Sequence, residues 1–340
     1  MTRVAIVGAT GYTGGELLDI LIRHPRVKVT SLTAKLEKAI PIDDEFPRFR
    51  GRVELPCTPL DVADVCERAD VVFLSLPHGV SMKFALLFHG EGKKIIDLSA
   101  DFRFTDPAVF EEWYGMSHGV KELLSEAVYG LPELHAGEIR KSRLIANPGC
   151  YPTGAILALA PLFHHRLVAL DDVIIDSKSG VTGAGRKASL ALSFGECNES
   201  FRAYRVGRHQ HTPEIEGELS RISGAPIQIL FTPHLAPMDR GILTTAYLRP
   251  LKKVSAEALI DLYTKFYERA PFVRVMENGK LVDTKNVRGL NYCDISVVVD
   301  GRTGRIVILS AIDNLVKGAA GQAVQNMNLV CGFPETMGLI

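Results

Sequence analysis

The chain begins with a short apolar run followed by three regularly spaced glycines, Val4-Ala5-Ile6-Val7-Gly8-Ala9-Thr10-Gly11-Tyr12-Thr13-Gly14. The apolar residues predict a buried strand, and the spacing G-x-x-G-x-x-G predicts a turn into a helix that covers residues 16–22. Glycine lets a backbone approach a pyrophosphate closely, and a helix N-terminus presents unpaired N–H groups to that anion. The alternative is an ordinary glycine-rich turn. The strand–turn–helix context favours a dinucleotide site formed by Gly8, Thr10, Gly11, Tyr12, Thr13 and Gly14.

Further short apolar runs follow this first strand. Residues 27–32, 71–76, 95–98 and 144–146 are strand-like, and the stretches between them are long enough for helices or loops. Continuous apolar runs of this kind are typical of parallel strands that are buried on both faces. We therefore expect a doubly wound α/β sheet of the Rossmann type in the first part of the chain.

The end of the predicted second strand indicates the type of nicotinamide cofactor. A ribose with a free 2′-hydroxyl is usually held by an acidic side chain at this place. The chain has Ser31, Thr33 and Lys35 there instead. Hydroxyl groups and a cation suit a 2′-phosphate, so the sequence favours NADP(H) over NAD. The alternative is a solvated loop.

The pattern of the chain changes after Cys150. Longer alternating runs at 173–178, 242–248, 293–299 and 305–311 predict an antiparallel sheet, and therefore an α+β domain. A helix over 254–269, capped by Ser255, is predicted to cover one face of that sheet. A last helix is predicted over 314–329, and the residues alone leave open where it packs.

Composition and charge exclude several classes of protein. The 340 residues suggest two domains, and 46% apolar with 23% charged residues is typical of a folded globular protein. Thirty-nine basic and 39 acidic residues give zero net charge, so we expect no general attraction to nucleic acid or membrane. The longest apolar stretch, 155–163, is too short for a membrane span, and no signal peptide is expected. Six scattered cysteines fit a reduced cytoplasmic protein without a metal site.

The strongest candidate for a nucleophile is Cys150, in the segment 147–154. This segment directly follows a predicted buried strand, and Pro152 is well placed for the first turn of a helix. A thiol at a helix N-terminus lies near the positive end of the helix dipole, which favours the reactive thiolate. The alternative is a buried cysteine that packs as a small apolar side chain. The other five cysteines lack this setting.

A candidate acid/base, His211, lies in the segment 207–216. Thr212 resembles an N-cap with Pro213 in the first turn, and Glu214 and Glu216 complement the dipole of the predicted helix. His211 directly precedes this helix, where a neutral imidazole is able to exchange protons. A structural histidine is the equally weighted alternative, since His209 lies beside it.

Two loops carry candidate anion-binding residues. Residues 178–187 combine three cations, among them Arg186, with several glycines, which suits a phosphate group as well as it suits a solvated loop. Residues 97–103 end another predicted parallel strand, where ligands of doubly wound sheets gather. In this segment Arg103 is a candidate to bind a substrate carboxylate. The alternative is an ion pair between Arg103 and Asp101.

These motifs together resemble the N-acetyl-gamma-glutamyl-phosphate reductases, NADPH-dependent enzymes of arginine biosynthesis. The resemblance is carried by residues 147–154 and 209–216 and continues through 8–14, 97–103, 179–186, 198–201 and 313–322. It implies that Cys150 is the nucleophile and His211 the acid/base. It also implies that the second domain is of the glyceraldehyde-3-phosphate dehydrogenase type, that the last helix returns to the cofactor domain, and that the enzyme is a homodimer or homotetramer.

With this resemblance the expected domains and contacts become specific. The NADP-binding domain is expected to comprise 1–149 and 313–340, and the catalytic, substrate-binding and oligomerisation domain 150–312. Further cofactor contacts are expected at Pro77, Gly180 and Asn314. Contacts to the substrate are expected at Arg103, Asn147, Arg186, Asn198 and Ser200.

The expected chemistry is reduction of an acyl phosphate through a thioester on Cys150. Phosphate leaves when the thiolate attacks, and hydride transfer then gives a thiohemiacetal that collapses to the aldehyde. Three alternatives stay open. Aspartate-semialdehyde dehydrogenase uses the same chemistry on a smaller substrate, a relative in lysine biosynthesis reduces a carrier-bound aminoadipyl phosphate, and a non-enzymatic NADPH-sensing protein would need only the first domain.

Overall fold

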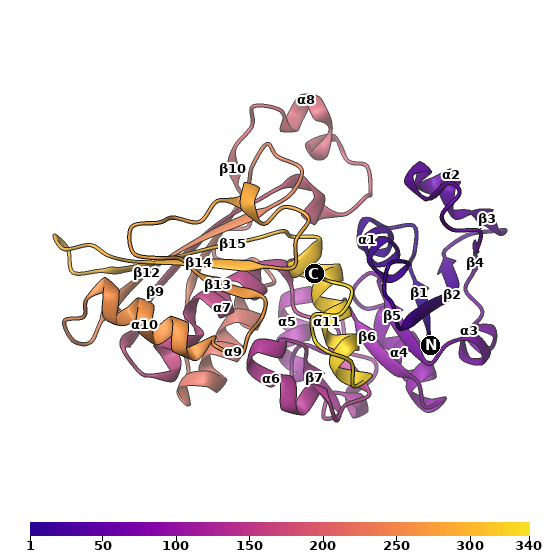
Figure 1. Cartoon of the computed structure of the whole chain (residues 1–340), viewed down its shortest axis with the longest axis horizontal. Coiled ribbons are helices and arrows are strands. Elements are labelled where there is room, and N and C mark those ends of the chain that lie inside the picture. Colours follow the sequence, from indigo (N-terminus) through magenta and orange to yellow (C-terminus); the bar gives the residue numbers. More distant parts are fainter. The chain divides into compact units, whose positions relative to one another are not determined.

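The computed structural model describes all residues from Met1 to Ile340 and divides the chain into two compact units. Unit 1 comprises Met1–Pro148 together with Ala319–Ile340, and unit 2 comprises Gly149–Gly318. The chain therefore leaves unit 1 once and returns to it near its end, as the colours of Figure 1 show. The return takes place at residue 319, a few residues later than the expected 313, so Asp313 and Asn314 belong to unit 2.

Unit 1 is built on a sheet of eight strands in the order β3-β4-β2-β1-β5-β6-β8-β7. All neighbouring pairs are parallel except β3–β4. Strand β1 lies inside the sheet, and the chain builds outward from it in both directions, which is the doubly wound arrangement. The strands are β1 Thr2–Val7, β2 Val27–Ala34, β3 Ile40–Pro41, β4 Pro56–Pro59, β5 Val71–Leu74, β6 Lys94–Asp97, β7 Ala127–Tyr129 and β8 Leu144–Ala146.

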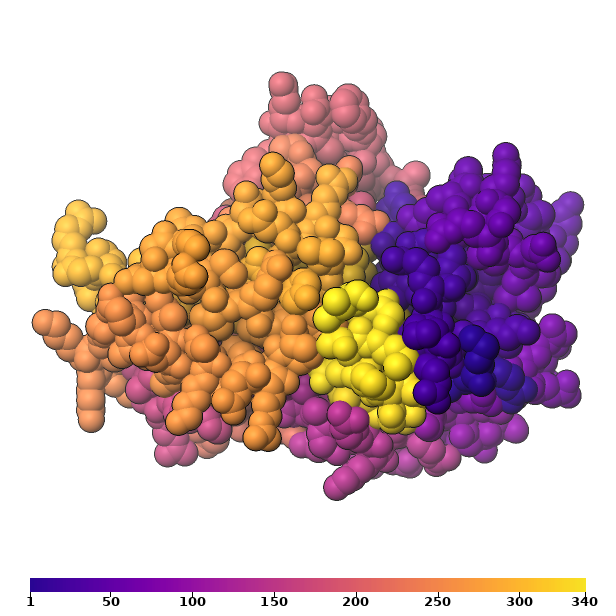
Figure 2. Space-filling view, in the orientation of Figure 1, coloured from indigo at the N-terminus to yellow at the C-terminus, as the bar shows by residue number.

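Helices cover both faces of this sheet, so residues 4–7 of β1 and all of β5 are apolar and buried. Ala5 and Val7 of β1 belong to a core cluster shared with α3 (Val62–Arg68) and α4 (Ser81–Gly90). On the other face α1 (Tyr12–Leu21) packs against α11 (Gly321–Val330). Figure 2 shows the yellow C-terminal residues beside the indigo N-terminal ones. The remaining helices of unit 1 are α2 Ile42–Glu45, α5 Pro107–Tyr114 and α6 Pro132–Ile139.

Unit 2 contains a sheet of seven strands in the order β10-β11-β9-β12-β15-β14-β13. Its central pairs are antiparallel, as expected, because β9, β12, β15 and β14 alternate in direction. The pairs β11–β9 and β13–β14 are parallel, so the sheet is mixed rather than fully antiparallel. The strands are β9 Val168–Ser179, β10 Arg202–Ala203, β11 Leu230–Leu235, β12 Ile242–Pro250, β13 Val273–Val275, β14 Cys293–Val299 and β15 Ile306–Ile312.

Three helices pack on or near this sheet. Helix α7 (Cys150–His164) contacts β9, β12, β14 and β15, while α9 (Thr212–Ser223) contacts α7. Helix α10 (Ala256–Phe266) is capped by Ser255, whose hydroxyl oxygen accepts the Ala258 N–H at 3.2 Å, as predicted. The short helix α8 (Phe194–Cys197) lies in the long segment between β9 and β10. No helix of the chain has the length and apolar character needed to cross a membrane.

Candidate active site

The glycine-rich turn after β1 depends on two close backbone approaches. Gly8 has a φ of +94°, and a Cβ there would lie 2.1 Å from the Ser75 carbonyl oxygen. A Cβ on Gly14 would lie 2.4 Å from the Gly8 carbonyl oxygen. Helix α1 then begins at Tyr12 with no side-chain cap and no acidic residue in its first turn. This N-terminus fits an anion such as a pyrophosphate.

The end of β2 adjoins that turn through backbone hydrogen bonds. The Thr33 carbonyl accepts the N–H groups of Gly8 and Ala9 at 2.8 and 2.9 Å. The Thr33 hydroxyl is buried and has no hydrogen-bond partner within the protein, while Lys35 is exposed just beyond the strand. Ser31 is buried deeper inside β2. An unpaired hydroxyl and a neighbouring cation are suitable partners for a phosphate of a bound nucleotide.

The loops after β5 and β6 are held together by two buried carboxylates. Asp101 accepts the N–H groups of Gly79 and Met82, each at 2.8 Å, and Asp97 accepts the hydroxyl of Ser81 at 2.5 Å. Burial raises the pKa of Asp97 to about 6, and the neighbouring Asp101 adds to this effect. The Pro77 carbonyl accepts the N–H groups of Val80 and Ser81, which closes the first of these loops.

Arg103 and Asn147 lie next to each other in unit 1. The Arg103 guanidinium donates to the carbonyl of Asn147 at 2.9 Å and to that of Leu98 at 3.0 Å. The Asn147 amide donates to the Ala319 carbonyl and accepts from Asn326. Both side chains therefore fix the chain just after β8, three residues before Cys150.

Cys150 is the first residue of α7, and its position is fixed by a buried glutamate. The Gly149 N–H, directly before Cys150, donates to the Glu214 carboxylate at 2.8 Å. Glu214 is 2% exposed and lies in the first turn of α9. The sequence predicted Glu214 only as a charge near a helix end. The structure shows that its carboxylate joins the N-termini of α7 and α9.

His211 is the N-cap residue of α9, and the predicted cap at Thr212 is wrong. The helix begins at Thr212, and Pro213 follows in its first turn. The His211 N–H donates to Nδ1 of His209 at 3.1 Å, so His209 orients the backbone before the helix. Burial, reinforced by the charge of Arg205, lowers the pKa of His209 to about 4. His209 is therefore neutral at physiological pH, and its Nδ1 is a hydrogen-bond acceptor.

Aromatic side chains connect the segment around Cys150 to these histidines. The Tyr151 ring, next to Cys150 in sequence, lies 5.5 Å from the His209 ring and 5.9 Å from the His211 ring between centroids. The Tyr151 and Tyr204 hydroxyl groups are 3.0 Å apart. Burial raises the pKa of Tyr204 to about 12, so its phenol stays protonated. Tyr204 carries no motif signal, and sequence reasoning missed it.

The segment after β9 is anchored within unit 2. Asn314 accepts the Gly241 N–H at 2.8 Å and donates to the Thr182 hydroxyl at 3.0 Å. A Cβ on Gly180 would lie 2.6 Å from the Asp239 carbonyl oxygen, so this position requires glycine. Arg186 and Asn198 are exposed farther along the segment, while the hydroxyl of Ser200 accepts a hydrogen bond from Arg202.

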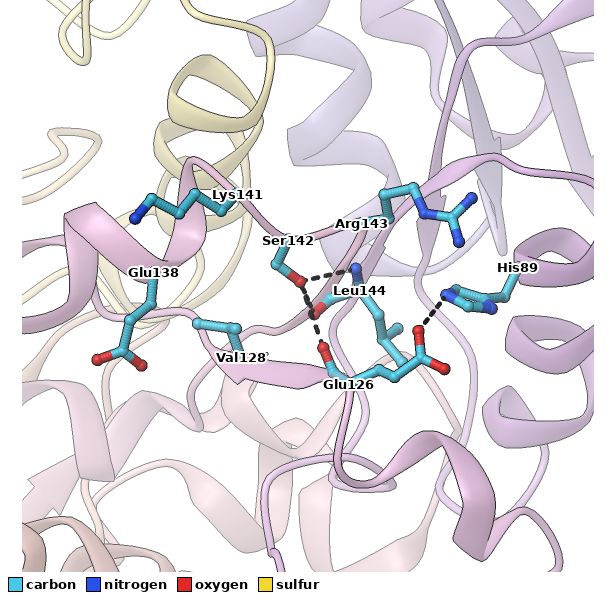
Figure 3. Close-up of a pocket in the computed structure, with 8 residues that line it drawn as sticks. All are labelled: His89, Glu126, Val128, Glu138, Lys141, Ser142, Arg143 and Leu144. Carbon is cyan, nitrogen blue, oxygen red and sulfur yellow. Dashed lines mark hydrogen bonds and ion pairs between the residues drawn. The ribbon is translucent and has the colours of Figure 1, made fainter.

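A surface hollow of about 300 Å³ lies outside these features. Figure 3 shows the side chains that line it. It is lined by residues around the amino ends of β7 and β8, including Glu126, Ser142 and Leu144. The glycine-rich turn follows the carboxyl end of β1. The hollow and this turn therefore lie at opposite ends of the parallel strands. No group of three or more His, Cys, Asp or Glu side chains is arranged to hold a metal ion.

Comparisons with known proteins agree with this geometry. The family model for the semialdehyde dehydrogenase NAD binding domain matches residues 3–142, and the model for the dimerisation domain matches 150–314. N-acetyl-gamma-glutamyl-phosphate reductases from Desulforudis audaxviator and Citrifermentans bemidjiense are 51% and 53% identical to the chain. Each alignment covers 100% of the chain and 98% of the relative. The chain belongs to the N-acetyl-gamma-glutamyl-phosphate reductase family. The resemblance found in the motifs is therefore confirmed.

Solved structures confirm the fold of this reductase family member. Aspartate semialdehyde dehydrogenase II from Vibrio cholerae, complexed with ASA, has a TM-score of 0.73 at 19% identity and covers 98% of each chain. The aspartate semialdehyde dehydrogenase with NADP from Candida albicans has a TM-score of 0.72 at 14% identity, covering 97% of this chain and 98% of its own. The reductase is thus an oxidoreductase of the semialdehyde dehydrogenase type with a domain for a nicotinamide cofactor.

Proposed function

We propose that the protein reduces N-acetyl-L-glutamyl 5-phosphate to N-acetyl-L-glutamate 5-semialdehyde and phosphate, with NADPH, in arginine biosynthesis. The observation that carries this proposal is the hydrogen bond between Gly149 and Glu214, directly beside Cys150. The buried Glu214 carboxylate holds the Gly149 N–H, so the thiol at the start of α7 and the N-cap His211 of α9 belong to one fixed arrangement. Relatives more than 50% identical over the whole chain support the substrate.

The reaction uses Cys150 as a nucleophile. Its thiolate forms a bond to the acyl carbon, the bond from that carbon to the phosphate oxygen breaks, and inorganic phosphate leaves. NADPH, when bound, supplies the hydride for reduction of the thioester. His211 then gives a proton to the substrate oxygen, and it removes that proton when the carbon–sulfur bond breaks and the thiolate returns.

The remaining predicted residues divide between cofactor and substrate. The pyrophosphate would be held by the glycine-rich turn, that is by Gly8, Thr10, Gly11, Tyr12, Thr13 and Gly14. The 2′-phosphate would be held by Thr33 and Lys35, with Ser31 supporting the strand. The nicotinamide half would be held by Pro77, Gly180 and Asn314. On the substrate side, Arg103 and Arg186 would bind anionic groups. The N-acetyl amide would be bound by Asn198 and Ser200, and Asn147 would fix the segment before Cys150. The close backbone approaches at Gly8 and Gly14 and the unpaired Thr33 hydroxyl support the cofactor part.

The assembly and location follow from the same proposal. A domain that matches a dimerisation family supports a homodimer or homotetramer. None of the six cysteines forms a disulfide, which supports the reducing environment of the cytoplasm.

A direct assay tests the proposed function. The purified full-length protein is given N-acetyl-L-glutamate 5-semialdehyde, NADP and inorganic phosphate, and formation of NADPH is followed by absorbance. Because the reverse reaction consumes phosphate, we expect the rate to depend on phosphate concentration. A protein that binds NADPH but forms no NADPH under these conditions would be a sensor rather than an enzyme.

The two neighbouring histidines are expected to differ in their effects on turnover. His211→Asn should lower kcat by about 10²–10⁴, the usual contribution of an acid/base group. His209→Asn should be milder, since His209 is neutral and only accepts a hydrogen bond, which an asparagine oxygen can also accept. Steady-state rates and cofactor titrations measure both variants. Equal effects, or a larger effect of His209→Asn, would refute the assignment.

Lys35 is expected to confer preference for NADPH over NADH. A charge-assisted hydrogen bond contributes about 1.5–3 kcal/mol, which corresponds to roughly ten- to a hundredfold in affinity. Lys35→Ala should weaken NADPH binding by that factor and leave NADH binding unchanged. Lys28→Ala, near the amino end of the same strand, is the matched control. Equal efficiency of the unmodified protein with both cofactors would contradict the preference.

A further inference from the structure

The turn that follows β15 is fixed by two side chains within unit 2. The Asp313 carboxylate accepts the N–H groups of Leu315 and Val316 at 2.8 and 3.1 Å, and its other oxygen accepts the Gly289 N–H at 2.8 Å. Asn314 is tied to Gly241 and Thr182. The start of the turn is therefore anchored to three separate loops.

The turn itself is π-helical over residues 316–320. The Gly318 N–H donates to the Asp313 carbonyl at 2.9 Å, a bond that spans five residues instead of the four of an α-helix. Within this turn Lys317 is fully buried, with its ammonium 5.7 Å from the centre of the Phe272 ring. The residue directly before Gly318 is therefore anchored in the interior of unit 2 by a cation–π contact.

Gly318 is the point at which this turn meets the nucleophile. A Cβ on Gly318 would lie 2.8 Å from the Cβ of Cys150 and 3.3 Å from its Cα. Neither atom can move by a side-chain rotation, so a methyl group at 318 must displace either the turn or the start of α7. The φ of Gly318 is in the ordinary range for any residue, so space and not backbone conformation requires glycine.

The geometry points to Gly318 as a positioning residue for the Cys150 thiol. On one side the Glu214 carboxylate holds the Gly149 N–H, and on the other side the anchored π-turn places the bare backbone of Gly318 against Cys150. Together they fix the first residue of α7, where the helix dipole stabilises a thiolate. This role in turnover rests on the proposed function, because it assumes that Cys150 carries the acyl group.

The test is Gly318→Ala in the full-length protein, with Gly217→Ala as the matched control. Gly217 lies inside α9, and a Cβ there would meet no atom within 4 Å. The first readout is the rate of Cys150 alkylation by iodoacetamide between pH 5.5 and 9.5, assigned by peptide mass spectrometry. For Gly318→Ala we expect the midpoint of this profile to move to higher pH, since the thiol leaves its place at the helix terminus. The control should keep the profile of the unmodified protein.

The second readout is turnover with N-acetyl-L-glutamate 5-semialdehyde. A displacement of about 1 Å at a reacting group can cost on the order of a hundredfold in rate, so kcat should fall far more than KM changes. An unmodified alkylation profile would overturn the inference whatever the effect on kcat. The alkylation profile needs no substrate, so it decides the role of Gly318 even if the semialdehyde proves not to be a substrate.

A second variant covers the case in which Gly318→Ala does not fold. Cys150→Gly removes the Cβ that the new methyl group would meet. Combined with Gly318→Ala, it should restore a folded protein, as judged by circular dichroism and binding of a nicotinamide cofactor. If the double variant is unfolded while Cys150→Gly alone is folded, the requirement for glycine at 318 does not come from the Cys150 Cβ, and the inference is wrong.

Discussion

Turnover is expected to fall by several orders of magnitude, on the order of 10⁴ or more, when Cys150 is replaced by serine. A serine hydroxyl is almost fully protonated at neutral pH and is a far weaker nucleophile than a thiolate. The Glu214 carboxylate bonds to the backbone N–H of Gly149 and not to the thiol, and the serine side chain is smaller than that of cysteine, so we expect this arrangement to persist. Affinity for the nicotinamide cofactor should be unchanged, and kcat measured in the phosphate-dependent assay checks the prediction.

Cys66→Ser is the matched control for this substitution. Cys66 is half-buried in unit 1, and burial raises the pKa of its thiol, so it does not supply a thiolate at neutral pH. Burial likewise raises the pKa of Cys57 to about 11. If the Cys150→Ser protein retained activity within about tenfold of the original, the covalent mechanism would have to be abandoned.

The second large effect concerns the substrate. N-acetyl-L-glutamate 5-semialdehyde should be oxidised about 10⁴ times more efficiently than L-aspartate 4-semialdehyde, measured as kcat/KM. The N-acetyl group removes the positive charge of the amine and adds an amide. A site that hydrogen-bonds such a group strongly rejects an analogue that lacks it, because its polar atoms are left unpaired.

N-acetyl-L-aspartate 4-semialdehyde separates the two contributions to this preference. It has the acetyl group but the shorter chain, so an intermediate efficiency would assign part of the preference to each. Asn198→Ala should reduce the preference for the acetylated compound, whereas Cys150 chemistry should be unaffected. Equal or greater efficiency with L-aspartate 4-semialdehyde would refute the substrate and leave the covalent mechanism in place.

Much of the fold is visible in the sequence because its signals are local. Val4–Val7 and the glycines after it predict a strand and turn from neighbouring residues, and β14 occupies the residues expected for it, 293–299. The parallel pair β11–β9 was not expected, since pairing between distant strands leaves no mark in either strand. For the same reason the sequence could not show where the last helix packs.

The candidate site contains features that depend on contacts between distant residues. Glu214 looks like an ordinary first-turn acid, and its bond to the Gly149 N–H appears only when α7 and α9 pack together. Thr212 has the residue type of an N-cap, yet Pro213 is also compatible with the second helical position, and the structure places the cap at His211. Gly318 lies in a segment with several small residues, so nothing local distinguishes it from Ala319 or Gly321.

The discontinuity of unit 1 has a consequence for how the polypeptide is made. A ribosome releases residues 1–148 first, but the helix α11 that packs against α1 belongs to the last 22 residues of the chain. Gln322 and Asn326 of α11 are buried, and both donate to the Gly130 carbonyl. Unit 1 therefore cannot complete its fold until residues 149–318 and then α11 have been synthesised. Until then one face of its sheet stays incompletely covered. Because residues 149–318 are contiguous, unit 2 can complete its fold before unit 1 does, although most of unit 1 is translated first.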